Sequence, residues 1–155
     1  MRHPHFLRHL LHRGRALTPA ALLSLVFCTA CATPVAEAPA LALTGTPWVL
    51  VSLGGEAVDP GVQPATLVMD VGSQRMHGHA GCNRLSGEYV REEASLSFSR
   101  LVTTKMACAK GMAQEQRFLQ ALANTQSHRV EAGRLILLDQ HGQPVATLMA
   151  EPSVG

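Results

Sequence analysis

Short runs of apolar residues, separated by glycine or polar turns, recur along the chain from residue 44 onward. Runs of this length that are rich in β-branched residues are typical of strands. The pattern predicts strands over residues 48–53, 66–70, 75–80, 89–91, 96–98, 135–138 and 145–148. The turns at 92–93 and 139–142 make hairpins of the last two pairs. Because residues 135–138 are continuously apolar, we expect that strand to be covered on both faces.

One segment has helical periodicity instead. Between Gly111 and Ser127 apolar residues recur close to helical spacing and the intervening residues are polar. The predicted stripe consists of Met112, Phe118, Leu119, Leu122 and Thr125. An amphipathic helix of this kind needs a sheet to cover. The sequence therefore predicts one α+β domain over residues 44–150, a small antiparallel, partly curled β-sheet with one amphipathic helix packed on it, followed by a tail over 151–155.

The first 30 residues follow a third pattern. Four arginines and no acidic residue occur in the first fifteen positions, and the apolar segment 20–27 follows, interrupted only by Ser24. A membrane-spanning helix needs about 20 apolar residues, so this segment is too short for a permanent anchor. The pattern predicts a signal peptide over residues 1–30.

Cys31 directly follows the small residues Thr29 and Ala30. This arrangement resembles the lipobox of bacterial lipoproteins, in which the cysteine becomes the first mature residue and carries the lipids. Cys28 stands where leucine is usual in that motif, and cleavage before Cys28 would place bulky Phe27 at the cut. A CxxC pair could also serve redox chemistry or zinc, but the βαβ context and the second ligand pair are missing. We therefore expect Cys31 to be the lipidated residue.

The segment after Cys31 is rich in alanine and contains two prolines. Residues 31–43 are therefore predicted to be a flexible tether between the membrane and the domain. Ala32 is not the aspartate that favours retention at the inner membrane, so the lipoprotein resemblance implies the periplasmic face of the outer membrane.

Charge argues against one class of partner. The formal net charge is +2, but the part after residue 30 holds nine basic and eleven acidic residues. Nucleic-acid affinity depends on clustered lysine and arginine, so we expect no nucleic-acid partner. Aromatic residues make up only 4% of the chain, and a small core poor in aromatic residues would benefit from a covalent crosslink.

Cys82 and Cys108 are the candidates for that crosslink. They lie 26 positions apart in the part expected to be exported, where disulfides persist. Closing a loop of this size contributes roughly 3–4 kcal/mol in the chain-entropy model. A pair of buried free thiols is the alternative. Catalysis by Cys82 would need a base and an orienting group, and only His79 is close in sequence.

Two histidines form a weak candidate metal site. His77 and His79 are two positions apart on a predicted strand, so both would project from the same face. A metal would need a third ligand, for which Asp70 and Glu88 are candidates. Solvated surface histidines are the more common case, so we expect no metal and no other cofactor.

Two short motifs resemble the signatures of the META domain family. The first is GCN at 81–83 followed by Gly87, and the second is a threonine followed by Met-Ala-Cys. The residues that carry the resemblance are Gly81, Cys82, Asn83, Gly87, Thr104, Met106, Ala107 and Cys108. Residues 115–122 are similar to the family's helix, and the resemblance covers about 44–150. A lipoprotein signal ahead of one such domain resembles the HslJ-like heat-shock lipoproteins.

The resemblance implies a small β-rich fold with one packed helix and a role in heat shock or novobiocin resistance, with no enzymatic activity. We expect Gly81 and Gly87 to serve turns or bulges and Asn83 to hydrogen-bond nearby backbone. No phosphate loop, GxSxG or HExxH motif is present. We therefore expect a monomeric, non-enzymatic envelope protein that supports envelope integrity or stress tolerance. Alternatives are a binding module for one envelope protein, such as a secretion-system pilot or an inhibitor of a cell-wall-degrading enzyme, and a histidine-based metal protein.

Overall fold

The computed structural model describes residues 41–151 of the chain. The expected signal peptide (1–30), Cys31, most of the tether (31–43) and most of the tail (151–155) lie outside the described residues. Residues 41–151 form β1 (Trp48–Leu53), β2 (Glu56–Ala57), β3 (Thr66–Met69), β4 (Arg75–His79), β5 (Arg84–Glu92), β6 (Ser95–Thr103), α1 (Met112–Ala123), β7 (Ser127–Glu131), β8 (Arg134–Leu138) and β9 (Pro144–Ala150). The predicted α+β class is confirmed.

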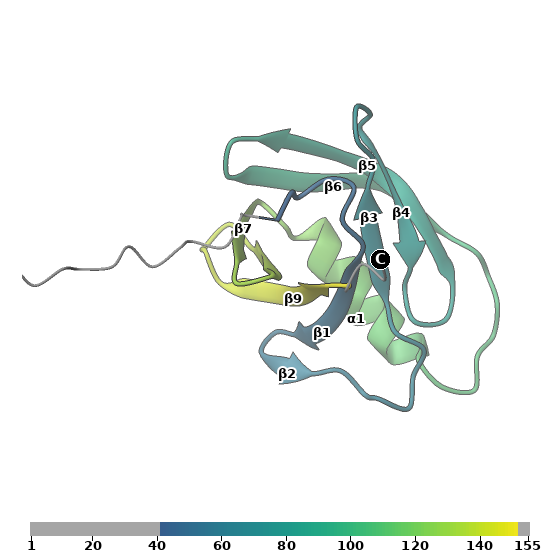
Figure 1. Cartoon of the computed structure of the whole chain (residues 1–155). Coiled ribbons are helices and arrows are strands. Elements are labelled where there is room, and N and C mark those ends of the chain that lie inside the picture. Colours follow the sequence, from purple (N-terminus) through teal and green to yellow (C-terminus); the bar gives the residue numbers. More distant parts are fainter. Residues whose placement is uncertain (1–40, 152–155) are drawn as a thin grey trace, which may run out of the picture. The chain divides into compact units, whose positions relative to one another are not determined.

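The strands form one antiparallel sheet that closes on itself. Their order is β2-β1-β3-β4-β5-β6-β7-β8-β9, and β1 pairs additionally with β9. The sheet therefore returns to its first strand, and the short β2 extends it beyond the ring. We expected a partly curled sheet, and the structure carries the curl to closure (Figure 1). Closure protects strand edges that would otherwise be open to pairing with another chain.

The core lies on the inner side of the closed sheet. Alternate side chains of most strands are buried there, as Leu67 and Met69 of β3 illustrate, whereas β2 and β7 contribute no buried side chain. Trp48 is fully buried as well, and its indole N–H donates to the Leu43 carbonyl at 3.0 Å. The large aromatic ring of this tryptophan is thus buried without leaving its polar atom unsatisfied.

Helix α1 packs within the curve of the sheet, against β6, β9 and β1 (Figure 1). Phe118 and Leu122 are fully buried, which confirms most of the predicted stripe, whereas Met112 is exposed. The helix ends at Ala123, earlier than predicted. Thr125 fits the stripe because it is buried, but it lies beyond the helix and donates to the Ala121 carbonyl at 2.8 Å. No helix among residues 41–151 is long and apolar enough to cross a membrane.

Several strand predictions need correction. β5 and β6 are longer than the predicted 89–91 and 96–98. β2 and β7 were not predicted, because β2 has two residues and the sequence of β7 is largely polar. The prediction that residues 135–138 are covered on both faces is wrong. Leu135 and Leu137 are fully buried, but Ile136 and Leu138 are only half-buried, because they point away from the core.

One junction of the closed sheet is short. β6 and β7 share a single register pair, Ser95 with Ser127. The backbone N–H of His128 adds a hydrogen bond of 2.9 Å to the Ala94 carbonyl. Neighbouring strands elsewhere in the ring pair over two residues or more.

Candidate functional site

The two sequence signatures meet at the turn between β4 and β5. The Ala80 N–H donates to the Asn83 carbonyl at 2.7 Å, which closes a tight turn. Gly81 occupies that turn with φ of 108°, a backbone conformation that glycine adopts readily and other residues rarely do. Its N–H donates to His79 Nδ1 at 3.1 Å. The expectation of a turn at Gly81 is therefore confirmed.

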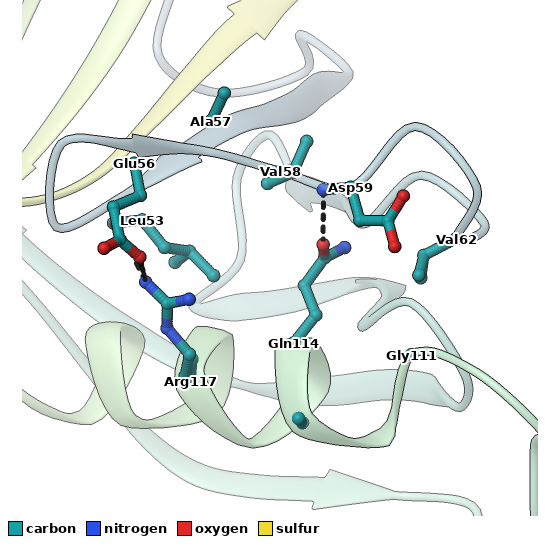
Figure 2. A pocket seen from close by; sticks show the side chains of 10 residues that line it. Leu53, Glu56, Ala57, Val58, Asp59, Val62, Gly111, Gln114 and Arg117 are labelled. Atoms are coloured by element: carbon teal, nitrogen blue, oxygen red, sulfur yellow. Dashed lines mark hydrogen bonds and ion pairs between the residues drawn. The ribbon is translucent and has the colours of Figure 1, made fainter.

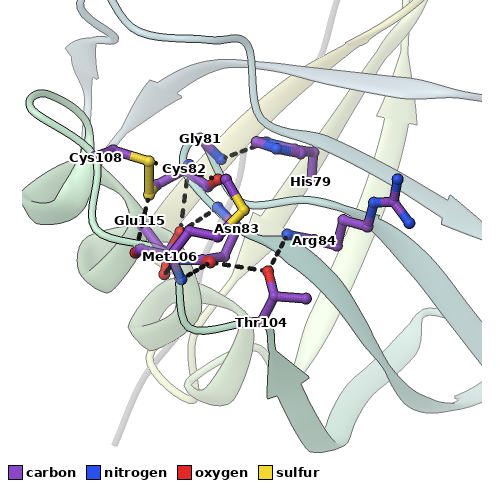
Figure 3. The surroundings of a disulfide bond; sticks show 9 residues. All are labelled: His79, Gly81, Cys82, Asn83, Arg84, Thr104, Met106, Cys108 and Glu115. Atoms are coloured by element: carbon purple, nitrogen blue, oxygen red, sulfur yellow. Dashed lines mark hydrogen bonds between the residues drawn. A yellow bond between two sulfur atoms is a disulfide. The ribbon is translucent and has the colours of Figure 1, made fainter.

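Asn83 is the centre of a buried hydrogen-bond network (Figure 3). Its side-chain Oδ1 accepts from Thr104 Oγ1 and from the Met106 N–H, both at 2.8 Å. Its Nδ2 donates to Glu115 Oε1 at 3.0 Å and to the Met106 carbonyl at 3.4 Å. Asn83 is only 2% exposed. One amide side chain thus joins the β4–β5 turn, the segment after β6 and helix α1.

Glu115 completes this network from α1, and sequence analysis did not name it as a site residue. Its Oε2 accepts from the backbone N–H groups of Asn83 at 2.7 Å and Cys82 at 3.3 Å. Glu115 is buried in the first turn of α1, where the helix dipole favours an acidic group. Gly111, the N-cap residue, supplies no side-chain cap. The two backbone donors come from residues more than thirty positions away in sequence, so no local pattern indicates this role.

Cys82 and Cys108 form a disulfide beside this network. Their Cα atoms lie 5.9 Å apart, within the usual range for a disulfide. The segment from Thr104 to Cys108 is therefore held by Asn83 at its centre and by a covalent bond at its end. The segment itself lies at the surface, and the Met106 side chain is 60% exposed. Only the backbone of Met106 takes part in the network.

Gly87 lies at a β-bulge, because the β5–β6 register shifts between Ser86 and Glu88. A Cβ atom at Gly87 would lie 2.9 Å from Leu101 Cδ2 and 3.0 Å from the Ser99 carbonyl oxygen. The expectation of a bulge is confirmed, and close packing is the physical reason for the glycine.

The two histidines of the weak metal candidate have separate partners. His77 Nδ1 lies 3.0 Å from Asp70 Oδ1, and His79 accepts the Gly81 N–H. The other candidate ligand, Glu88, bonds Arg100 at 2.9 Å. Within residues 41–151 no group of three or more His, Cys, Asp or Glu residues is arranged to hold a metal ion.

A small groove lies between the loop after β2 and the first half of α1 (Figure 2). Its volume is about 270 Å³. Two contacts bridge it: Arg117 Nη2 bonds Glu56 Oε2 at 2.8 Å, and the Asp59 N–H donates to Gln114 Oε1 at 3.2 Å. Val58 lies between the two bridges. The first of these contacts pairs Arg117 with Glu56, whereas, among residues 41–151, the Asp59 carboxylate at the other end of the groove accepts only the Gly61 backbone N–H, at 2.8 Å.

Among residues 41–151, two titratable groups have shifted pKa values, and both lie outside the hydrogen-bond network of Asn83, Thr104, Met106 and Glu115, which we call the signature network. Burial lowers the pKa of His128 at the β6–β7 junction, and the charge of nearby Arg91 lowers it further. The hydrogen bond to the Ala94 carbonyl raises this pKa but does not offset the effect of burial. The Gln143 N–H lowers the pKa of exposed Asp139 in the β8–β9 turn, and the His141 N–H acts in the same direction. Neither is near a cluster of potential catalytic groups, so neither arrangement suggests acid–base chemistry.

Comparison with known proteins gives a family match and several similar solved structures. The family model of the META domain matches residues 41–152. An NMR structure of a protein from Burkholderia xenovorans is 28% identical with a TM-score of 0.58, covering 77% of this chain and 97% of that one. A second NMR structure is 24% identical with a TM-score of 0.55, covering 70% of this chain and 91% of that one.

A crystal structure of a DUF4847 family protein from Bacteroides vulgatus is 12% identical with a TM-score of 0.52, covering 70% of this chain and 94% of that one. This structure and the second NMR structure support the fold alone. No curated protein matches the chain.

Proposed function

Since the chain belongs to the META domain family, we propose that it is a lipid-anchored, non-enzymatic binding protein of the bacterial cell envelope. Lipid on Cys31 holds the domain at the periplasmic face of the outer membrane. There it supports envelope integrity under heat or drug stress, as the HslJ-like resemblance implies.

The observation that carries the non-enzymatic part is how the signature residues are used. Asn83, Thr104 and Glu115 bond one another and nearby backbone. No buried polar side-chain atom in residues 41–151 lacks a partner. Catalytic groups are typically accessible in a cleft and carry perturbed pKa values. A network whose members are satisfied by each other supports an architectural role for the signature.

The cysteines support the location. A disulfide between Cys82 and Cys108 is compatible with an oxidising compartment such as the periplasm. The N-terminal pattern of basic residues, a short apolar segment and a cysteine after small residues supports export with lipidation. Together they favour a domain tethered outside the cytoplasm.

The test compares two cysteine substitutions in the full chain expressed in a bacterial host. Cys31→Ser removes the proposed lipid attachment, and Cys28→Ser is the matched control three positions away. We expect wild type and Cys28→Ser to fractionate with the outer membrane and to carry acyl chains in intact-mass spectra. Cys31→Ser should carry none. Lipid on Cys28, or an unlipidated wild type, would contradict the proposal.

A strain lacking the gene tests the role. We expect increased sensitivity to heat and to novobiocin, restored by wild type and by Cys28→Ser but not by Cys31→Ser. Equal rescue by Cys31→Ser would show that anchoring is irrelevant to the role. A deletion strain as tolerant as its parent would contradict the role in stress tolerance itself.

A further inference from the structure

The outward side of β4, β5 and β6 carries two shallow hollows, and the second of them is bordered by Thr104 of the signature network. The first, of about 300 Å³, is lined in part by Arg75, Glu88 and Arg100. Arg75 lies opposite Glu88 in the β4–β5 register, and Arg100 Nη1 bonds Glu88 Oε1 at 2.9 Å. The lining therefore contains two arginines and one carboxylate, which leaves this hollow with an excess of positive charge.

The second hollow, of about 400 Å³, adjoins the first at Ser86. His77, Ser86 and Val102 form one row across the three strands. Arg84 borders the same hollow, and Figure 3 shows its side chain directed away from the disulfide. Val102 is 62% exposed, although it is apolar. This side of the sheet thus carries an exposed valine on β6, separated from His77 by Ser86, and Arg84 borders the same hollow.

We call Arg75, Arg84, Arg100, Lys105 and Val102 the cationic face. Lys105 is exposed and directly follows Thr104, whose backbone and hydroxyl bond the backbone of Arg84, so the backbone of Lys105 lies at the edge of this face. None of the ion pairs found within residues 41–151 includes Arg75, Arg84 or Lys105.

The cationic face contrasts with the remainder of the described chain. The sequence has no acidic residue between Glu93 and Glu115. Among residues 41–151, the carboxylates that pair with side chains on this side of the sheet are Asp70, with His77, and Glu88, with Arg100. When Asp70, Glu88 and the four basic residues of the face are left out, the rest of residues 41–151 contains five basic and eight acidic residues. The positive charge is therefore concentrated on one side of the domain.

We propose that the cationic face binds the anionic headgroups of a lipid bilayer, with Val102 entering the interface. The basic groups are exposed and distributed over three strands, which suits a lateral array of anions better than a single enclosed ion. An exposed apolar side chain among basic residues gains by leaving water at the headgroup boundary. An acidic polypeptide is the competing partner, and the experiment below separates the two.

This inference rests on the proposed function, because it assumes that a lipid on Cys31 holds the domain near the membrane. The ten residues from Cys31 to Leu41 span at most about 35 Å, so a lipid on Cys31 keeps the domain close to the bilayer. Lipid attachment alone leaves the orientation of the domain open. A second contact through the cationic face would fix which side of the domain faces the membrane.

The test measures binding of the unlipidated mature chain, residues 31–155 with Cys31→Ser, to vesicles. Vesicles of phosphatidylcholine with phosphatidylglycerol are compared with phosphatidylcholine alone. Arg84→Glu with Lys105→Glu reverses two charges on the cationic face, and Arg129→Glu with Arg134→Glu makes the same charge change on β7 and β8. We expect the first pair to weaken binding to anionic vesicles about tenfold or more and the control pair to bind like wild type. Equal weakening by both pairs, or no binding by wild type, would overturn the proposal.

The apolar contribution is tested with a second matched pair. Val102→Ser should weaken binding severalfold, whereas Met149→Ser, which removes an exposed apolar side chain on β9, should not. Soluble polyglutamate is added to anionic vesicles as a competitor. Preferential binding to polyglutamate, with no loss in Val102→Ser, would replace the bilayer with an acidic protein partner.

Failure here can be told apart from failure of the proposed function. Lipidation of Cys31 is scored by fractionation and mass, whereas the vesicle test uses chains without lipid. All variants begin at residue 31 and so lack the basic residues of the expected signal peptide, and differences between them therefore report the domain. Circular dichroism and thermal unfolding of each variant show whether it is folded.

Discussion

The signature network and the cationic face are neighbours in the structure but use polar residues in opposite ways. Around Asn83 and Glu115 the polar side chains are buried and bonded to one another. On the cationic face, a few residues away at Arg84 and Lys105, they are exposed and have no ion-pair partner among residues 41–151. The first region determines how the chain folds, and the second is available to something outside the molecule.

This difference explains why a recognisable motif need not indicate chemistry. The signature resides where distant segments must be joined, and its residue types follow from hydrogen-bond geometry. Asparagine provides both a donor and an acceptor at one position, which the network requires of Asn83. The exposed residues of the cationic face are not constrained by such hydrogen-bond geometry, so their residue types can instead reflect binding.

The largest effect on stability is expected from the disulfide. Cys82→Ala with Cys108→Ala should lower the free energy of unfolding by about 3–4 kcal/mol, because the unfolded chain gains the entropy of an open loop. Chemical denaturation of both proteins, with and without reductant, measures the difference. Reductant should destabilise wild type and leave the double variant unchanged. Equal stability without reductant would mean that the thiols are unpaired.

Glu115→Gln should lower the free energy of unfolding by about 2 kcal/mol. The amide has one acceptor oxygen for two sets of donors, so its NH₂ group would face either a backbone N–H or Asn83 Nδ2. Glu131→Gln on exposed β7 is the control and should change stability by less than about 0.5 kcal/mol.

A double-mutant cycle sharpens the same point. Asn83→Asp turns the donor toward Glu115 into an acceptor and should be more destabilising than Glu115→Gln. In the double variant, Gln Nε2 can donate to the aspartate. The loss of unfolding free energy in the double variant should therefore be smaller than the sum of the losses in the two single variants. Strict additivity would show that the bond between the two side chains contributes little.

A smaller effect is expected from His128 at the β6–β7 junction. Because burial lowers the pKa of His128 in the folded state, the unfolded state binds more protons below the ordinary value of 6.5. Stability should therefore be fully present above pH 6.5 and decline as the pH falls through 6.5 toward the folded pKa. Unfolding curves between pH 5 and 8 measure this slope, and His128→Gln should reduce it. An unchanged slope would assign the pH dependence to another group.

The smallest effect on stability is expected at the cationic face. Arg84→Glu with Lys105→Glu should change the free energy of unfolding by less than about 0.5 kcal/mol per substitution, because both side chains are exposed. Thermal unfolding beside wild type measures this change. A loss of several kcal/mol would place these residues with the network instead of the surface.

Most strands could be predicted because their alternation is local. The patterns at 48–53, 66–70 and 75–80 match β1, β3 and β4 to within a residue. β7 could not be predicted, since Ser127–Glu131 contains a single apolar residue and its conformation depends on pairing with β8. Closure of the sheet through β1 and β9 joins segments almost a hundred positions apart, which no local pattern reveals.

The candidate site divides in the same way. Gly81, Asn83 and Thr104 were found from the family resemblance, and the turn expected at Gly81 is present. The Asn83 side chain, expected to bond neighbouring backbone, instead bonds groups more than twenty positions away. The role of Glu115 could not be found, because an acid in the first turn of a helix is common and its donors are distant in sequence. The cationic face was missed as well, since Arg75, Arg84 and Lys105 are scattered in sequence and gather only through strand pairing.

The most direct test of the division between the two regions measures unfolding free energy and vesicle binding in the same two variants. Glu115→Gln should lose about 2 kcal/mol of stability and still bind anionic vesicles like wild type at a temperature where it remains folded. Arg84→Glu with Lys105→Glu should keep its stability and lose about tenfold in binding. If folded Glu115→Gln also lost vesicle binding, or if the charge reversal lowered stability and binding together, the signature network and the cationic face would be one functional unit and the division would be wrong.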